Sequence, residues 1–148
     1  MDSAIEIKNV WKIFGNNSEE ALNAIQNQRI SKQEALEKYN SVIGVSDVSF
    51  NVKKGEIFCV MGLSGSGKST LVRHINRLLE PTSGQILINN EDVMKFDSKS
   101  LQDLRNKKIG MVFQNFALMP HRSVLDNIAM PLEIRGISKN DRLDAANK

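Results

Sequence analysis

The loop at residues 62–70 reads GLSGSGKST and combines three glycines with one lysine and several hydroxyl side chains. Residues 62–69 match the pattern of a glycine, four residues, then Gly-Lys-Ser, which is the P-loop pattern. Glycines let a backbone turn so that its N–H groups converge on phosphate oxygens at a helix N-terminus, and the lysine adds a positive charge. This spacing therefore predicts a site for the phosphate chain of a nucleotide.

Each residue of this loop has an expected role. We expect Lys68 to reach the β- and γ-phosphates and the Ser69 hydroxyl to bind Mg²⁺. The hydroxyl of Thr70 and the N–H groups of the two loop serines complete the cradle. The expected phosphate-binding set is Gly62, Leu63, Ser64, Gly65, Ser66, Gly67, Lys68, Ser69 and Thr70.

The segments on either side of the loop decide whether the match is meaningful. Residues 56–61 (EIFCVM) are apolar throughout and predict a short central strand, in which Cys59 is expected to be a small core residue. After the loop, apolar residues recur at helical spacing until Pro81 and Gly84 predict a stop. Because a P-loop requires a buried strand before it and a helix after it, a chance match in a glycine turn is the weaker interpretation.

The remaining sequence predicts strands alternating with helices, which indicates an α/β fold with an at least partly parallel sheet. Further strands are predicted at residues 4–14, 45–52, 85–89 and 109–113. The first two of these predict paired strands with one solvated face.

Three helix starts carry the spacing of a capping motif. Residues 16–42 predict a polar helical insertion between the two opening strands, with Ser31 and Glu34 placed as a capping box. Ser123 and Ser138, each followed three residues later by aspartate, predict two helix starts near the C-terminal end.

Composition limits the class of protein. The chain has 148 residues, 41% of them apolar, which is enough for one domain with a core. The net charge of +3 is too mild and too dispersed to predict a nucleic-acid partner. No run of apolar residues is long enough for a membrane span, and the polar N-terminal residues do not resemble a secretory signal, so we expect a cytosolic protein.

Several longer stretches resemble the nucleotide-binding subunit of ATP-binding-cassette transporters. The stretches are residues 5–15, 44–93 and 109–136, which together cover most of the chain. Within that superfamily, the sequences NRLLEPTSG and MVFQNFALMPHRSVLDNIA and the insertion at 16–42 are similar to the quaternary-amine importers that take up glycine betaine and proline. The resemblance implies a P-loop NTPase fold, with a RecA-like core and an antiparallel β subdomain, incomplete here and followed by the start of a helical subdomain.

The resemblance also implies roles for two further residues. Phe14 falls where the family keeps an aromatic residue that stacks on adenine; Trp11 is the rival aromatic, and an edge-strand core role is the alternative for Phe14. Gln114 falls on the family's glutamine that contacts Mg²⁺ and the attacking water, so that Lys68 and Gln114 are the expected catalytic residues and Ser69 and Gln114 the expected metal ligands.

The family's partners are implied in the same way. The implied partners are a membrane permease, docking near Phe116, Leu118, Met119 and Pro120, a second copy of the subunit and, indirectly, a substrate-binding protein. Packing in an ordinary internal core is an equally weighted alternative role for these docking residues. The implied location is the cytoplasmic face of the plasma membrane, and the implied cofactors are ATP and Mg²⁺.

Some motifs of the family do not occur in the sequence. A Walker B strand ending in Asp-Glu, an LSGGQ-like signature and a switch histidine are all missing from residues 1–148. We therefore expect an N-terminal fragment, with residues 1–115 forming the first part of the cassette and 116–148 starting the helical subdomain, and negligible ATP hydrolysis by this chain alone. Alternative functions are a non-hydrolysing nucleotide-binding or regulatory module and a small P-loop kinase.

Overall fold

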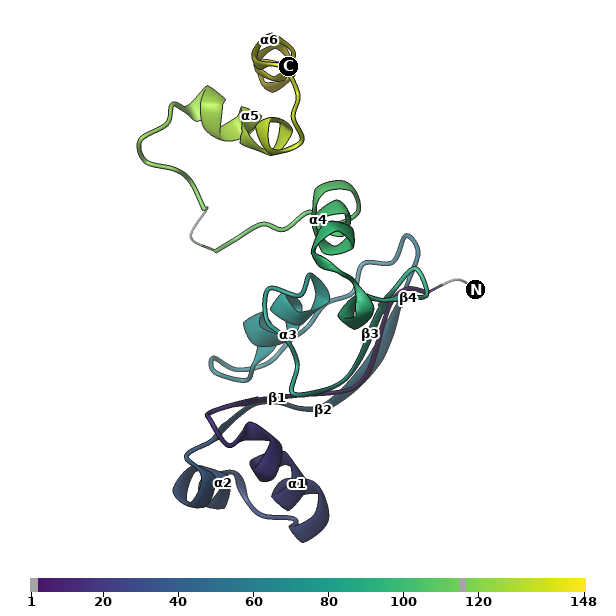
Figure 1. Ribbon diagram of the computed structural model, residues 1–148, viewed down its shortest axis with the longest axis vertical. Helices are drawn as coiled ribbons and strands as arrows, with labels where there is room; N and C mark the ends of the chain where they lie inside the picture. The colour runs from purple at the N-terminus through teal and green to yellow at the C-terminus, as the bar shows by residue number, and fades with distance from the viewer. Residues whose placement is uncertain (1–2, 115–116) are drawn as a thin grey trace. The chain divides into compact units, whose positions relative to one another are not determined.

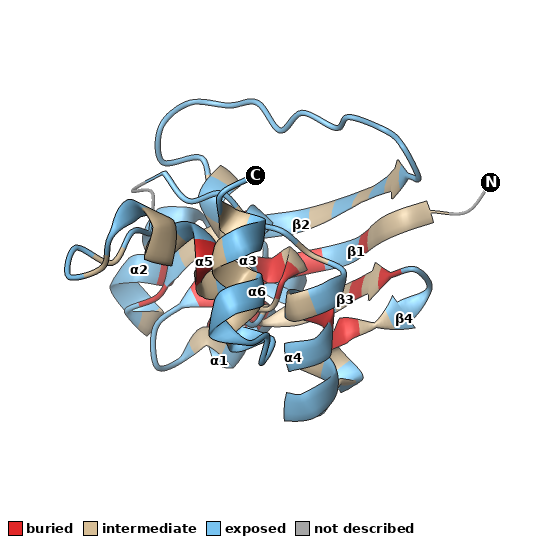
Figure 2. Cartoon of the chain, turned by 90° about the horizontal axis from the view of Figure 1, so that it is seen from above, coloured by how far each residue is buried: buried red, intermediate tan, exposed pale blue. Residues whose placement is uncertain are grey.

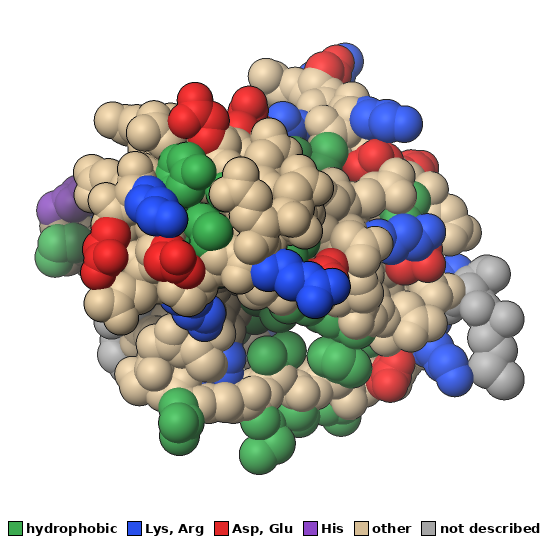
Figure 3. All heavy atoms as spheres, turned by 90° about the horizontal axis from the view of Figure 1, so that it is seen from below, with side chains coloured by type: hydrophobic (Ala, Val, Ile, Leu, Met, Phe, Trp, Pro, Cys, Tyr) green, Lys and Arg blue, Asp and Glu red, His purple; other side chains and the backbone are tan. Residues whose placement is uncertain are grey.

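The computed structural model describes residues 3–114 and 117–148 (Figure 1). The chain forms two compact units, Met1–Asp97 and Ser98–Lys148, and each is described by itself below. None of the helices in the described part of the chain is long and apolar enough to cross a membrane. On the face shown in Figure 3, Lys and Arg side chains are interspersed with Asp and Glu side chains.

An antiparallel sheet forms the framework of the first unit. Its strands are β1 (Ser3–Phe14), β2 (Val42–Lys53), β3 (Ser83–Ile88) and β4 (Glu91–Asp92). They lie in the order β2-β1-β3-β4, and every pairing is antiparallel. The predictions of paired opening strands and of a third short strand are therefore confirmed, whereas the expected parallel pairing does not occur among the described strands.

The centre of this sheet carries several of the largest fully buried side chains. Strand β1 has a neighbour on each side, and its residues Ile7, Val10 and Ile13 are buried, as is Ile86 of β3 (Figure 2). Strand β2 alternates exposed and partly buried residues from Asp47 to Lys53, as expected for a strand with one solvated face.

The predicted helical insertion between β1 and β2 is confirmed. It consists of α1 (Ser18–Gln28) and α2 (Lys32–Tyr39), which lie together at one end of the sheet (Figure 1). The capping box forms as expected, because the Ser31 hydroxyl accepts from the N–H of Glu34 while the Glu34 carboxylate accepts from the N–H of Ser31. Trp11 of β1 packs with Leu22 of α1 in the core that joins the insertion to the sheet.

Helix α3 (Lys68–Ile75) follows the glycine loop, as predicted, but it ends before the predicted stop. Arg77 adopts a left-handed conformation (φ 54°), and the N–H of Leu79 donates to the carbonyl of Arg73 at 3.1 Å. The guanidinium of Arg77 then donates to the carbonyls of Val93 and Phe96 at 3.3 and 2.8 Å, in and after the short 3-10 helix η1 (Val93–Lys95). The helix therefore ends at a reversal of the backbone, upstream of Pro81.

Two predictions of buried strands are wrong. Residues 56–61 and 109–113 form no strand, and their side chains reach solvent, with Ile57 92% and Val112 96% exposed. A strand forms only where a neighbour satisfies its backbone hydrogen bonds, and none of the described strands pairs with either segment. Cys59, expected in a core, is exposed for the same reason.

All regular secondary structure in the described part of the second unit is helical. It contains α4 (Ser98–Lys107), α5 (Val124–Ile134) and α6 (Lys139–Ala146). Both predicted helix starts are confirmed, because the hydroxyls of Ser123 and Ser138 cap α5 and α6.

Candidate nucleotide-binding site

The glycine loop leads directly into α3, and its last glycine is held by the surrounding backbone. Gly67 is the residue before the helix and has a φ of 88°, a conformation that side-chain-bearing residues rarely adopt. A Cβ atom at Gly67 would also overlap the carbonyl oxygen of Gly44 in β2. Glycine is therefore required at this position by both conformation and space.

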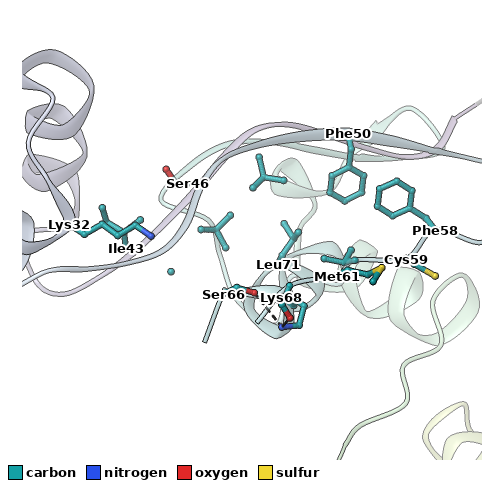
Figure 4. A pocket seen from close by; sticks show the side chains of 16 residues that line it. Lys32, Ile43, Ser46, Phe50, Phe58, Cys59, Met61, Ser66, Lys68 and Leu71 are labelled. Carbon is teal, nitrogen blue, oxygen red and sulfur yellow. Dashed lines mark hydrogen bonds between the residues drawn. The ribbon is translucent and has the colours of Figure 1, made fainter. Parts of the chain in front are cut away.

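The ammonium of Lys68 lies within the loop. Its Nζ donates to the carbonyls of Gly62 and Leu63, both at 2.7 Å, and to the hydroxyl of Ser66 at 3.3 Å (Figure 4). The side chain of Lys68, the first residue of α3, thus reaches back along the six residues that precede it. This geometry places a positive charge at the centre of the loop, where a phosphate chain needs it.

The first turn of α3 supplies backbone donors beside that charge. The first intrahelical bond runs from the N–H of Leu71 to the carbonyl of Gly67 at 2.8 Å, so helix geometry leaves the N–H groups of Lys68, Ser69 and Thr70 without helical acceptors. These donors and the helix dipole favour an anion. The N–H of Ser66, which was expected to join the cradle, donates to the carbonyl of Leu63 at 3.2 Å in this structure.

A cavity of about 510 Å³ opens beside the loop, between α3 and β2. Its polar lining includes Ser66 and Lys68, and Gly44 and Val45 line it from β2. Its apolar end is formed by Phe50 of β2 and Phe58, whose rings stack at 4.7 Å between centroids (Figure 4).

The two candidate aromatics have different surroundings. Trp11 is only 8% exposed and belongs to the core with α1, whereas Phe14, at the end of β1, is 40% exposed. The Nζ of Lys12 lies 5.2 Å from the centroid of the Phe14 ring. Of the two, Phe14 is therefore the aromatic that offers ring surface to a ligand.

The donor set for a metal ion is sparse. No group of three or more His, Cys, Asp or Glu side chains gathers in the part of the chain that the structure describes. Ser69 is exposed on the first turn of α3, next to the phosphate-binding donors. This arrangement fits Mg²⁺ held by one hydroxyl, nucleotide phosphates and water rather than by a protein cage.

The remaining expected site residues lie in the second unit. Gln114 is exposed, directly after the segment 109–113. Of the expected docking residues, Leu118 is 65% exposed, Pro120 is exposed and Met119 is partly buried; Phe116 lies outside the described residues.

Two side chains and one glycine around the site were not predicted from the sequence. Gly44 separates Phe14 from the loop, and a glycine inside a strand is a signal of close backbone approach that could have identified it. No sequence signal identified Lys12 beside Phe14, and none identified His74. His74 is completely buried in α3, and its Nδ1 lies 2.7 Å from the carbonyl oxygen of Leu79.

A glycine-rich loop that holds a lysine at the N-terminus of a helix, beside a cavity, defines a P-loop nucleotide-binding protein. Comparison with known families gives the family. The ABC transporter family model matches residues 45–148, and the chain belongs to that family.

Two of the similar curated proteins are named for glycine betaine transport. The chain is 51% identical over 142 residues to the glycine betaine/proline betaine transport system ATP-binding protein ProV of Escherichia coli. It is 46% identical over 142 residues to the glycine betaine transport ATP-binding protein OpuAA of Bacillus subtilis. Each alignment covers 96% of this chain but 35% and 34% of the relative, so the chain spans about a third of their length.

A solved structure gives the same assignment. The chain resembles the dimeric ATP-binding cassette MJ0796 in a post-hydrolysis state bound to ADP and Pi, with a TM-score of 0.73 and 30% identity, over 96% of this chain and 53% of that one. The expected α/β P-loop NTPase fold class is thereby confirmed, as is membership of a family of transport ATPases.

Proposed function

We propose that this chain binds ATP with Mg²⁺ and belongs to the energy-coupling subunit of an importer for glycine betaine, proline or similar osmoprotectants. The observation that carries the nucleotide part is Lys68 held at the centre of the loop by two carbonyls. The substrate part is supported by the relatives that transport glycine betaine.

The residues of the first unit have distinct tasks in this proposal. Lys68 exchanges its carbonyl partners for the β- and γ-phosphates, and the N–H groups at the start of α3 bind the same phosphates. Phe14 stacks on the adenine. The hydroxyl of Ser69 holds Mg²⁺, which supplies charge neutralisation on the phosphates.

Gln114 also has a role in this proposal. We propose that it orients the attacking water and contacts Mg²⁺, and that residues 1–115 form the N-terminal part of the cassette and residues 116–148 the beginning of the helical subdomain. Negligible hydrolysis by this chain alone stays a prediction.

The proposed partners follow from the same family. We propose that a permease subunit docks near Phe116, Leu118, Met119 and Pro120, that a second copy pairs with this one and that a substrate-binding protein acts indirectly. The exposed apolar side chains of Leu118 and Pro120 support a docking role. The proposed location is the cytoplasmic face of the membrane.

Uptake of labelled substrate tests the proposal. Cells that express the whole energy-coupling subunit containing this chain, together with its permease, should take up labelled glycine betaine, and Lys68→Ala should reduce that uptake to background because the phosphate charge is no longer paired. Lys99→Ala, an exposed lysine on α4, is the matched control and should transport normally.

Uptake of labelled methionine tests the proposed substrate separately from the proposed role of the loop. Methionine importers also match the chain, at 51% identity over 66% of it. Uptake of labelled methionine in place of glycine betaine would contradict the substrate, and full uptake by Lys68→Ala would contradict the role of the loop.

A further inference from the structure

The ring of Phe14 occupies space that only glycine leaves open in the facing strand. The end of β1 pairs with the start of β2, with Ile13 opposite Ile43 and Phe14 opposite Val42. A Cβ atom at Gly44 would lie 2.6 Å from Cε2 and 3.2 Å from Cδ2 of Phe14. Both distances are shorter than ordinary van der Waals contact, so any side chain at position 44 displaces the ring.

The other side of Gly44 faces the phosphate loop. Its carbonyl oxygen occupies the place that a Cβ atom of Gly67 would need, and Gly44 lines the cavity beside Lys68. Gly44 is therefore in close contact both with the aromatic ring and with the last residue before α3. Phe14 does not line that cavity, and Gly44 is the link between the two.

A second contact restrains the ring. The Nζ of Lys12 lies 5.2 Å from the ring centroid and donates to the carbonyl of Glu80 at 2.8 Å, which fixes the ammonium in place. A cation beside an aromatic ring is attracted by the electrons of the ring. Lys12 and Gly44 together define where Phe14 lies.

The requirement at position 44 is for space and not for backbone conformation. Gly67 has a positive φ, but Gly44 does not fall in the left-handed region that favours glycine. Alanine or valine can therefore take the backbone conformation of Gly44 without strain. The effect of such a substitution passes through the ring of Phe14.

We propose that Gly44 is a positioning residue for base recognition. By leaving room for the ring of Phe14 beside Gly67, it sets one fixed spacing between the stacked base and the phosphate cradle. This inference rests on the proposed binding of ATP. It predicts that Gly44 governs affinity for the base of the nucleotide and not for its phosphates.

Graded substitutions and two ligands test this role. The protein and its Gly44→Ala and Gly44→Val variants are titrated with ATP and with inorganic tripolyphosphate, both with Mg²⁺. Loss of base stacking on an aromatic ring should lower ATP affinity by about 5- to 150-fold, and further for valine than for alanine. Tripolyphosphate affinity should stay unchanged, because the loop and Lys68 are untouched.

A double-mutant cycle shows whether the effect passes through the ring. Phe14→Ala alone should weaken ATP binding about as much as Gly44→Val, and adding Gly44→Val to Phe14→Ala should cause little further loss. Gly110→Ala is the matched control, because no heavy atom lies within 4 Å of the added methyl group. Circular dichroism confirms that each variant is folded, and Gly44→Ala replaces Gly44→Val if the larger residue prevents folding.

The outcomes separate this inference from the proposed function. Three results would each overturn the positioning role. The first is unchanged ATP affinity in both folded Gly44 variants, and the second is an equal loss of affinity for tripolyphosphate. The third is an undiminished effect of Gly44→Val on ATP affinity in the Phe14→Ala background. If the unmodified protein binds neither ligand, the proposed function itself fails, and the positioning role fails with it.

Discussion

Lys68 shows how a single residue prepares the site for a phosphate chain. Its ammonium already contacts three oxygen atoms of residues 62–66. In the proposed function, a bound phosphate chain would replace these neutral acceptors with charged ones, which form stronger hydrogen bonds. The pattern of glycines and lysine predicted this contact region from sequence because the loop makes its contacts within a few residues of itself.

His74 is a residue that no sequence pattern identified, and it makes the stability of the protein depend on pH. Burial lowers the pKa of His74, because it disfavours the charged imidazolium; the hydrogen bond with Leu79 opposes this shift, and the charge of Lys12 adds to it. Its pKa is therefore lower in the folded protein than in the unfolded chain, where it is about 6.5. Between the folded-state and the unfolded-state pKa of His74, the unfolded chain binds more protons than the folded protein. The contribution of neutral His74 to the free energy of unfolding is therefore complete above pH 6.5 and is lost as the pH falls.

Urea unfolding between pH 7.5 and 5 measures this effect. We expect the free energy of unfolding to fall below pH 6.5, by at most about 1.4 kcal/mol per pH unit for this one proton. His74→Leu should remove that part of the slope, whereas the exposed His121→Leu should keep it. The same slope in His74→Leu and in the unmodified protein would contradict the assignment.

At the scale of elements, the sequence predicted the features that depend on neighbouring residues but not those that depend on contacts far along the chain. The alternation in β2 and the caps of α2, α5 and α6 depend on neighbouring residues, and all of them form. The apolar runs 56–61 and 109–113 were predicted as strands, but a strand also needs a partner, which its own residues cannot specify. The early end of α3 depends on Arg77 reaching η1, a contact sixteen residues further along the chain.

The loop before α5 is held by one side chain. The Asn127 amide donates to the carbonyls of Met119, Arg122 and Ser123 at 3.1, 3.3 and 2.9 Å, and its oxygen accepts from the N–H of Met119 at 2.8 Å. These bonds fix residues 119–123 against the first turn of α5.

Removal of that side chain should loosen the segment. In Asn127→Ala we expect amide hydrogen exchange at Met119 to become about tenfold faster, because each net hydrogen bond is worth about 1 kcal/mol. Asn127→Asp keeps the acceptor and should show a smaller effect at Met119, and Asn140→Ala on α6 is the control. Equal exchange in all variants would show that the segment is held by other contacts.

At the scale of the whole molecule, the antiparallel sheet and the glycine loop together carry the residues expected to bind the nucleotide. Strand β1 carries Phe14, β2 carries Gly44, and α3 begins at Lys68, so one unit contains the residues expected to bind base and phosphate. The sequence predicted Phe14 and Lys68 individually, but not Gly44. Their spatial relation through Gly44 required the strand pairing of the folded unit.

Titration of the purified protein with ATP and Mg²⁺ tests the central claim most directly. We expect saturable binding that weakens by at least about tenfold in Lys68→Ala, since a hydrogen bond to a charged group is worth about 1.5–3 kcal/mol, and that is unchanged in Lys99→Ala. Equal affinity of Lys68→Ala and the unmodified protein, or no saturable binding by the unmodified protein, would contradict the assignment of this loop as the nucleotide site.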